Sequence, residues 1–206
     1  MKVLIDAGPT RESLDPVRFI TNHSTGKMGY ALAAAAVRAG HSVTLVSGPV
    51  TLPEPEGLAE FVPVVTASQM AEAMKTRFPE ADLTILCAAV ADYRPKVYSH
   101  VKCKKSDGPL ILELERTEDI ALTLGRMKRA GQILVGFAAE TDQLERYALE
   151  KLRAKNLDWI AANNVSDGFG KDTNKVTLYG RNGEKIVLPT APKHEIAAQI
   201  LREVLK

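Results

Sequence analysis

A glycine-rich segment that runs into a helical pattern is the clearest place for anion chemistry in this chain. It comprises residues 22–29 (NHSTGKMG) and leads into an expected helix at 30–38. Backbone N–H groups and the positive end of a helix bind phosphate at such a junction. The glycines could instead serve close packing of the helix on a strand. We predict a phosphate loop made of Ser24, Thr25, Gly26, Lys27 and Gly29.

The loop matches neither common nucleotide fingerprint. A P-loop would need glycine at position 21 and Ser or Thr after Lys27, where the chain has Thr21 and Met28. Of the dinucleotide fingerprint only the last two glycines are present, and the expected second strand ends in Ser47-Gly48 rather than an acid. Tyr147-x-x-x-Lys151 mimics the catalytic pair of short-chain dehydrogenases. An NAD(P)-dependent oxidoreductase is therefore kept as the alternative hypothesis.

A second candidate segment follows the expected strand at 83–88. Small side chains from Ala88 to Ala91 let a ligand approach the backbone, and Asp92 could hold a ribose hydroxyl or a metal ion. The residues that follow, up to Lys105, are rich in lysine and include Lys102. This basic stretch is interpreted as a mobile lid, with a solvated run of charge as the alternative.

Two lysines lie on one face of an expected helix. Lys151 and Lys155 are four residues apart, so their charges repel by a few tenths of a kcal/mol. A bound anion would remove that repulsion. A pair of lysines exposed to solvent is the commoner explanation for such spacing.

The elements that position these residues alternate between strand and helix patterns, which predicts an α/β fold: a Rossmann-like, doubly wound, mostly parallel sheet in a single domain, 1–206. Two regions, 110–115 and 175–188, alternate or turn like antiparallel strands. They could form a dimerisation element or cover one edge of the sheet. The expected strands are 2–7, 42–47, 61–65, 83–88, 133–137 and 159–163, and the expected helices are 30–38, 69–77, 118–129, 144–155 and 193–206.

Composition excludes several classes of protein. The 27 basic and 25 acidic side chains give a net charge of +2, so general attraction to nucleic acid or to a membrane is not expected. No stretch approaches the ~18 apolar residues of a membrane helix. The two cysteines form neither a disulfide framework nor a metal motif, which indicates a reducing, cytoplasmic location.

Several motifs together resemble the phosphopantothenate–cysteine ligase family, the ligase half of bacterial bifunctional coenzyme A biosynthesis proteins. The resemblance runs nearly end to end. The motifs that carry it are GPTRE (8–12), DPVRFI (15–20), NHSTGKMG (22–29), AAVADY (88–93), KCKK (102–105) and GFAAET (136–141).

The resemblance implies a reaction in two steps. The carboxylate of 4′-phosphopantothenate attacks the α-phosphate of CTP and gives an acyl-cytidylate and pyrophosphate; the amine of L-cysteine then displaces CMP. Lysines, backbone donors and Mg²⁺ suit the charge that develops on the oxygens. A nucleotide-sensing module without turnover is a third hypothesis.

The family's roles carry over to matching positions. They imply that Asn22 is catalytic together with Lys102 of the lid, and that Arg18 and Ala89 bind the phosphopantothenoyl group. The positions implied for CTP are Asp92, Lys102, Glu118, Asp119, Ile120, Ala121, Phe137, Lys151 and Lys155.

The resemblance also implies Mg²⁺ bound with CTP, a homodimer, and a flavin-dependent decarboxylase domain that this chain lacks, fused to it or associated with it. The sequence names no metal ligands. Family members often have Asn-Pro where this chain has Thr117-Glu118, so the contacts of that turn are expected to differ.

Overall fold

An eight-stranded sheet forms the centre of the chain in the computed structural model, which describes residues 1–105, 107–168 and 170–206. From one edge to the other the strands are β12 (Lys185–Pro192), β11 (Thr173–Gly180), β10 (Trp159–Asn164), β9 (Ile133–Glu140), β6 (Leu83–Leu86), β1 (Lys2–Ala7), β4 (Ser42–Ser47) and β5 (Glu60–Pro63).

Six of these strands, from β10 to β5, are parallel. Numbered in chain order they follow the sequence 3-2-1-4-5-6, the arrangement of a doubly wound nucleotide-binding sheet. The order reverses between β1 and β6, and the crevice outside the carboxyl ends of these two strands is where such sheets bind ligands. The predicted fold class is confirmed.

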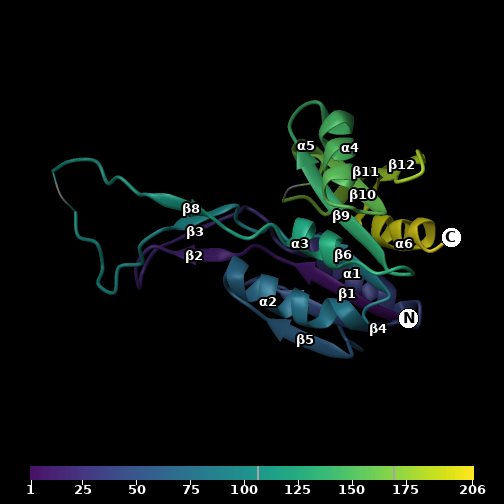
Figure 1. Cartoon of the computed structure of the whole chain (residues 1–206), viewed down its shortest axis with the longest axis horizontal. Coiled ribbons are helices and arrows are strands. Elements are labelled where there is room, and N and C mark those ends of the chain that lie inside the picture. The colour runs from purple at the N-terminus through teal and green to yellow at the C-terminus, as the bar shows by residue number, and fades with distance from the viewer. Residues whose placement is uncertain (106, 169) are drawn as a thin grey trace.

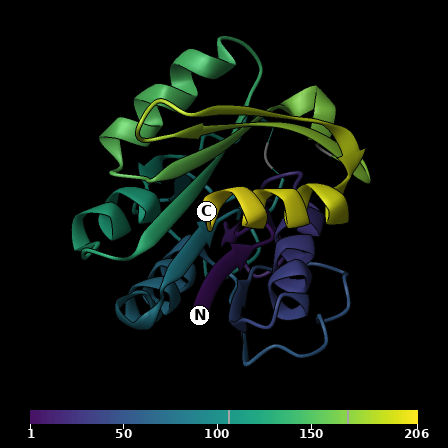
Figure 2. The same ribbon diagram turned by 90° about the vertical axis from the view of Figure 1, so that its right-hand side faces the viewer.

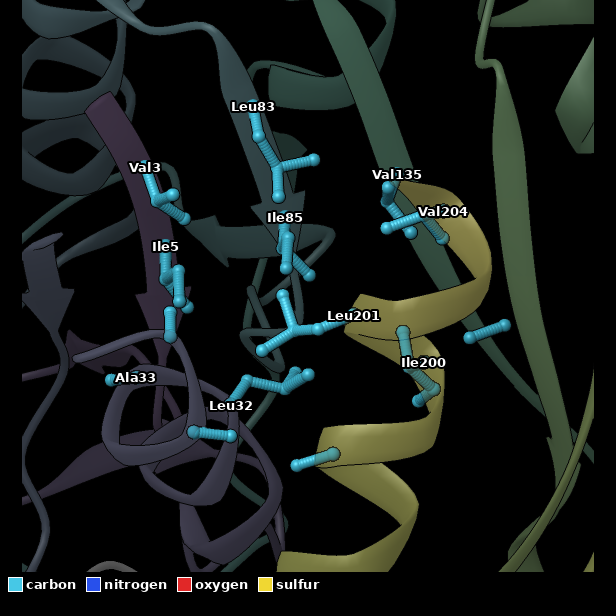
Figure 3. Close-up of a cluster of buried hydrophobic side chains, with 14 of the residues drawn as sticks. Val3, Ile5, Leu32, Ala33, Leu83, Ile85, Val135, Ile200, Leu201 and Val204 are labelled. Atoms are coloured by element: carbon cyan, nitrogen blue, oxygen red, sulfur yellow. The ribbon is translucent and has the colours of Figure 1, made fainter. Parts of the chain in front are cut away.

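The central strands carry apolar side chains on both faces, so both faces of the sheet must be covered by helices. Val3 and Ile5 of β1 belong to one apolar cluster and Leu4 to another, because successive side chains of a strand point to opposite faces. The first cluster packs under α1 and α6, as Figure 3 shows for Leu201 and its neighbours. The second packs under α2, α3 and α4.

Figure 2 shows α6 lying across one face of the sheet beside α1. Both helices close their face with small and branched apolar residues. The helices are α1 (Lys27–Arg38), α2 (Ala67–Arg77), α3 (Ile120–Met127), α4 (Leu144–Ala154), the short α5 (Val165–Gly168) and α6 (Lys193–Val204), with a 3₁₀ turn at Phe78–Glu80.

The antiparallel extension predicted at 175–188 is present as the hairpin β11–β12. It pairs with β10 and covers that edge of the sheet. The predicted antiparallel extension is confirmed, and its use as a dimerisation element stays a prediction.

The strand predicted at 110–115 is wrong in its bounds. Only Leu114–Arg116 (β8) is a strand, and it pairs with β7 (Tyr93–Pro95) rather than with the main sheet. The preceding residues 110–113 are exposed and outside any strand. Apolar and polar residues alternate in this segment, but no other part of the chain that the structure describes packs against its apolar side chains.

A long arm extends from the carboxyl end of the sheet (Figure 1). It consists of the hairpin β2–β3 (Arg11–Ser13 and Phe19–Thr21), the ribbon β7–β8 and the loop between β7 and β8. Among the residues that the structure describes, no helix is long and apolar enough to cross a membrane.

Candidate active site

Two adjoining pockets lie at the crevice where the strand order reverses. Pocket 1 has a volume of about 160 Å³ and pocket 2 about 200 Å³, and Ala88 and Phe137 line both. Neither reaches the ~300 Å³ at which small-molecule pockets usually begin. The shared lining residues make the two pockets neighbouring parts of one crevice.

Pocket 2 gathers most of the residues that the sequence assigned to a nucleotide. They come from the ends of β6 and β9, the turn before α3, and one face of α4. The predicted residues that line it are Asp92, Glu118, Asp119, Ile120, Ala121, Phe137, Lys151 and Lys155; of that set, Lys102 alone is absent from its lining.

The two lysines of α4 are partnered by carboxylates of the chain itself. Lys151 Nζ lies 2.6 Å from Glu140 Oε1, and Lys155 Nζ lies 2.9 Å from Asp119 Oδ2. These carboxylates offset the repulsion that the spacing of the two lysines predicts, and binding of an anion between them stays a prediction. Both ion pairs are partly exposed, so an incoming phosphate can compete for the lysines at modest cost.

Glu118 and Asp119 also build the turn before α3. Asp119 caps the helix by accepting a hydrogen bond from Leu122 N at 3.0 Å. Glu118 accepts from Lys75 Nζ at 3.0 Å, and this contact lowers the pKa of its carboxyl group. Since both side chains are engaged, the backbone of this turn is held in place beside the pocket.

Asp6 is a site residue that sequence reasoning missed. It is the penultimate residue of β1, is almost fully buried and lines pocket 2. Its carboxylate accepts hydrogen bonds from Cys87 N at 2.6 Å and Ala88 N at 2.7 Å. Burial raises the pKa of its carboxyl group to about 7, although the two backbone donors oppose the shift. Asp6 therefore fixes the wall between the two pockets.

Pocket 1 contains the whole predicted phosphate loop, Ser24 to Gly29. Gly26 adopts a left-handed conformation (φ 77°) at the start of α1, where no side chain caps the helix. A Cβ on Gly29 would lie 2.5 Å from the Cβ of Ala7. Gly29 is therefore needed for close packing of α1 on β1, and the free helix N-terminus opens into the pocket.

Asn22 lies at the junction of the arm and the sheet. Its Nδ2 group donates to Ala89 O at 2.8 Å, and the same carbonyl accepts from Thr10 N at 3.3 Å. Ala89 N in turn donates to Gly8 O at 2.9 Å. The loops that follow β1 and β6 are thereby joined, and Ala89 is placed on the wall of pocket 1.

Three predicted site residues line neither pocket. Asn22 contacts the wall of pocket 1 through Ala89 O. Arg18 lies on the arm, where its guanidinium group donates to Asp15 Oδ2 at 2.6 Å and to Cys103 O at 2.8 Å. This contact holds the pKa of the Asp15 carboxyl group well below its ordinary value. Lys102 is exposed in the loop between β7 and β8. The structure does not bring Arg18 and Lys102 to the other predicted site residues.

The far wall of pocket 1 was also missed by sequence reasoning. Asn163, Asn174 and Lys193 line it, from β10, β11 and the start of α6. Asn163 falls in an expected strand at its carboxyl end, a position that could have marked it. Nothing in the local sequence marks Asn174 or Lys193. Asn174 is brought here by the course of the chain into β11, and Lys193 by its return through the β11–β12 hairpin.

Comparison with known proteins identifies the family. The model of the DNA/pantothenate metabolism flavoprotein C-terminal domain matches residues 1–206. This chain belongs to that family. It is 55% identical over 205 residues to the coenzyme A biosynthesis bifunctional protein CoaBC of Bacillus subtilis, covering 98% of this chain and 50% of that protein. The CoaBC of Escherichia coli is 44% identical over 211 residues, covering 100% of this chain and 52% of that protein.

Solved structures share the fold of this chain. A crystal structure of the C-terminal domain of CoaBC has a TM-score of 0.85 at 48% identity, covering 98% of this chain and 93% of that one. A Cab2 variant in complex with phosphopantothenate-cysteine has a TM-score of 0.84 at 20% identity, covering 99% of this chain and 85% of that one, and shows the fold alone. The chain spans about half the length of the CoaBC proteins it matches.

Proposed function

We propose that this chain is a ligase domain that joins 4′-phosphopantothenate to L-cysteine at the expense of CTP, in coenzyme A biosynthesis. The observation that carries the proposal is the pair of adjoining pockets, one lined by the residues assigned to a nucleotide and the other by the phosphate loop. The family supports it, since its bifunctional members act in coenzyme A biosynthesis and a fold relative binds phosphopantothenate-cysteine.

In this proposal the nucleoside occupies pocket 2 and the phosphates reach pocket 1. Lys151 and Lys155 would leave their carboxylates for phosphate or base oxygens, while Asp92 accepts from a ribose hydroxyl. The free N–H groups at the start of α1 would hold the terminal phosphates. These donors stabilise pyrophosphate as a leaving group.

The first step forms a bond between a carboxylate oxygen of phosphopantothenate and the α-phosphorus. The bond from that phosphorus to its bridging oxygen breaks, and pyrophosphate leaves with the electron pair. Cations and backbone donors that are already in place lower the barrier, because negative charge grows on the leaving oxygens.

The second step forms the amide. The cysteine nitrogen attacks the activated carbonyl carbon and loses a proton, and the bond from that carbon to the phosphate oxygen breaks to release CMP. The Asn22 amide, which is held on Ala89 O at the edge of pocket 1, is proposed to orient the acyl-cytidylate for this attack.

Mg²⁺ is proposed to enter with the triphosphate. Within residues 1–105, 107–168 and 170–206, no cluster of three or more His, Cys, Asp or Glu side chains could hold a metal ion. In the same residues, Asp92 is the carboxylate of pocket 2 with neither an ion pair nor a side-chain hydrogen bond. Phosphate oxygens and water, with Asp92 nearby, suit the ion's preference. The ion would neutralise charge on the triphosphate.

A homodimer formed through the arm is part of the proposal. The arm exposes many large apolar side chains, and their contact with water is unfavourable unless a partner covers them. Arg18 and Lys102 line neither pocket of their own chain. In such a dimer they would reach the site of the neighbouring protomer. The exposed large apolar residues of the arm are Val17, Phe19, Tyr93, Val97, Tyr98, Val101, Leu110, Ile111, Leu112 and Leu114.

The flavin-dependent decarboxylase domain stays a proposed partner, fused or associated. The relatives CoaBC are bifunctional, and this chain matches about half of each. The proposal for the ligase site does not depend on that partner.

The test is pyrophosphate release from CTP, followed with and without each co-substrate. The proposal expects release that requires phosphopantothenate, and CMP with phosphopantothenoylcysteine once cysteine is added. Release of pyrophosphate without phosphopantothenate, or CTP binding with no product, would overturn it; the latter result would indicate a nucleotide-sensing module.

The dehydrogenase alternative has little structural support. Tyr147 lines neither pocket, and Lys151 pairs with Glu140 instead. A change in nicotinamide absorbance with a carbonyl substrate would revive it.

A further inference from the structure

A buried lysine outside the phosphate loop also lines pocket 1. Lys193 begins α6 and is only 8% exposed. Its ammonium group donates to Gly168 O at 2.8 Å and to Lys171 O at 2.5 Å. An ammonium group has three N–H donors, so one donor remains for another acceptor.

Lys193 forms no direct ion pair in the part of the chain that the structure describes, although the charge of Asp172 acts on it from farther away. No carboxylate lies within 4.0 Å of its Nζ atom among the residues that the structure describes. Burying an ammonium group without a counter-ion is costly. Burial, together with the nearby charge of Lys27, lowers the pKa of Lys193.

Lys27 of the phosphate loop is the second cation of the pocket. Its Nζ atom lies 2.5 Å from Asp172 Oδ1, and the Asp172 side chain is largely exposed. Both lysines line pocket 1, whereas Asp172 does not. Two ammonium groups and a free helix N-terminus therefore share one cavity, with one exposed carboxylate beside them.

A neutral donor completes this wall. Asn174 is 3% exposed and lines pocket 1. Its Oδ1 atom accepts from Lys175 N at 3.0 Å, while its Nδ2 group has no acceptor in the part of the chain that the structure describes. The wall thus offers two donors, the Lys193 ammonium group and the Asn174 amide, to an oxyanion in the pocket.

We propose that Lys193, assisted by Asn174, binds a phosphate group of a substrate in pocket 1, so that the antiparallel extension supplies half of the phosphate site. This inference rests on the proposed function for the identity of its ligand. The phosphate could belong to the nucleotide, which leaves as pyrophosphate, or to 4′-phosphopantothenate. The two sources share one chemistry, and binding measurements separate them.

The test measures binding without turnover. Isothermal titration with pyrophosphate and with 4′-phosphopantothenate is carried out on the unmodified chain, Lys193→Met and Lys193→Arg. The control is Lys175→Met, which removes an exposed lysine of β11 that lines neither pocket. Cytidine, which carries no phosphate, reports on pocket 2 alone.

Lys193→Met is expected to weaken binding of one phosphate ligand by about tenfold to hundredfold, the effect of losing one charge-assisted hydrogen bond. Lys193→Arg should restore part of it, and cytidine binding should not change. The ligand whose affinity falls identifies the source of the phosphate. Binding of both phosphate ligands by Lys193→Met within about twofold of the unmodified chain would overturn the inference.

A second variant tests the inference independently, in case Lys193→Met loses affinity because it unfolds. Asn174→Asp keeps the side-chain volume and leaves Lys193 in place, but it puts a negative charge in the wall. It should weaken the same ligand by at least about tenfold. Unchanged affinity in Asn174→Asp would contradict the inference. Because these readouts need no ligation, a Lys193-dependent anion site would survive even if the ligase function failed.

Discussion

At the scale of single residues, Asn22 offers the sharpest separation of the two proposed steps. In Asn22→Ala, Ala89 O keeps its hydrogen bond from Thr10 N, so the pocket wall should hold. We expect pyrophosphate formation to continue while phosphopantothenoylcysteine falls by about a hundredfold, as for the loss of one orienting donor.

The measurement compares pyrophosphate and product yields in one reaction mixture. Asn182→Ala, in the exposed turn between β11 and β12, serves as the control. Normal coupling of the two steps in Asn22→Ala would remove Asn22 from its proposed role.

Asp6 predicts a pH dependence of stability. Its pKa is raised to about 7 in the folded chain, so the native state binds a proton that the unfolded state releases above its ordinary value of 3.8. Between these two pH values the contribution of Asp6 to stability falls as the pH rises. Asp6→Asn keeps an oxygen for Cys87 N and Ala88 N but cannot ionise.

The free energy of urea unfolding of Asp6→Asn, relative to the unmodified chain, should therefore rise from pH 5 to pH 8 by on the order of 2 kcal/mol. A difference that is flat across this range would show that Asp6 ionises in the native state at its ordinary pKa.

At the scale of elements, the packing of α1 on β1 depends on Gly29. A Cβ at this position would lie 2.5 Å from Ala7 Cβ and 3.2 Å from Asp6 O, so the helix must shift. Gly29→Ala is expected to destabilise the chain by ~1–3 kcal/mol and to weaken pyrophosphate binding. Gly108→Ala is the matched control, because a Cβ added there would meet nothing within 4 Å. Equal denaturation midpoints for the two variants would contradict this packing argument.

The exposed apolar residues of the arm lead us to expect a dimer in solution. Ile111 is 87% exposed, and Ile111→Glu should weaken an arm-mediated dimer without touching the sheet. Sedimentation velocity should show a dimer for the unmodified chain and a shift toward monomer for the variant. Val187→Glu, which changes an exposed residue of the edge strand β12, should remain a dimer. The reverse pattern would place the contact on the β11–β12 hairpin.

Sequence patterns predicted the main sheet well because its strands are buried on both faces and bounded by turns. They failed at 110–115, where the alternation belongs to an exposed arm segment with only Leu114–Arg116 in a strand. A period of two indicates an extended chain but does not identify the strand that pairs with it. Local patterns likewise do not specify the order of the strands in the sheet, which depends on how the whole chain folds.

At the scale of the whole molecule, the site follows from where the strand order reverses. Residues after β1 and β6 could be placed near the crevice from the sequence, because ligands bind at the carboxyl ends of such strands. Lys193 could not, since it reaches pocket 1 only after the chain has turned back through two antiparallel strands. Arg18 and Lys102 depend on where the arm extends, which no local pattern specifies.

The central claim is that one nucleotide spans both pockets, and a crystal structure of the chain with CTP and Mg²⁺ tests it most directly. We expect the cytidine moiety in pocket 2 beside Phe137, with Lys151 and Lys155 turned from their carboxylates toward the ligand, and the terminal phosphates against Gly26 in pocket 1. CTP bound away from the crevice, or confined to one pocket with the triphosphate directed into solvent, would contradict the account.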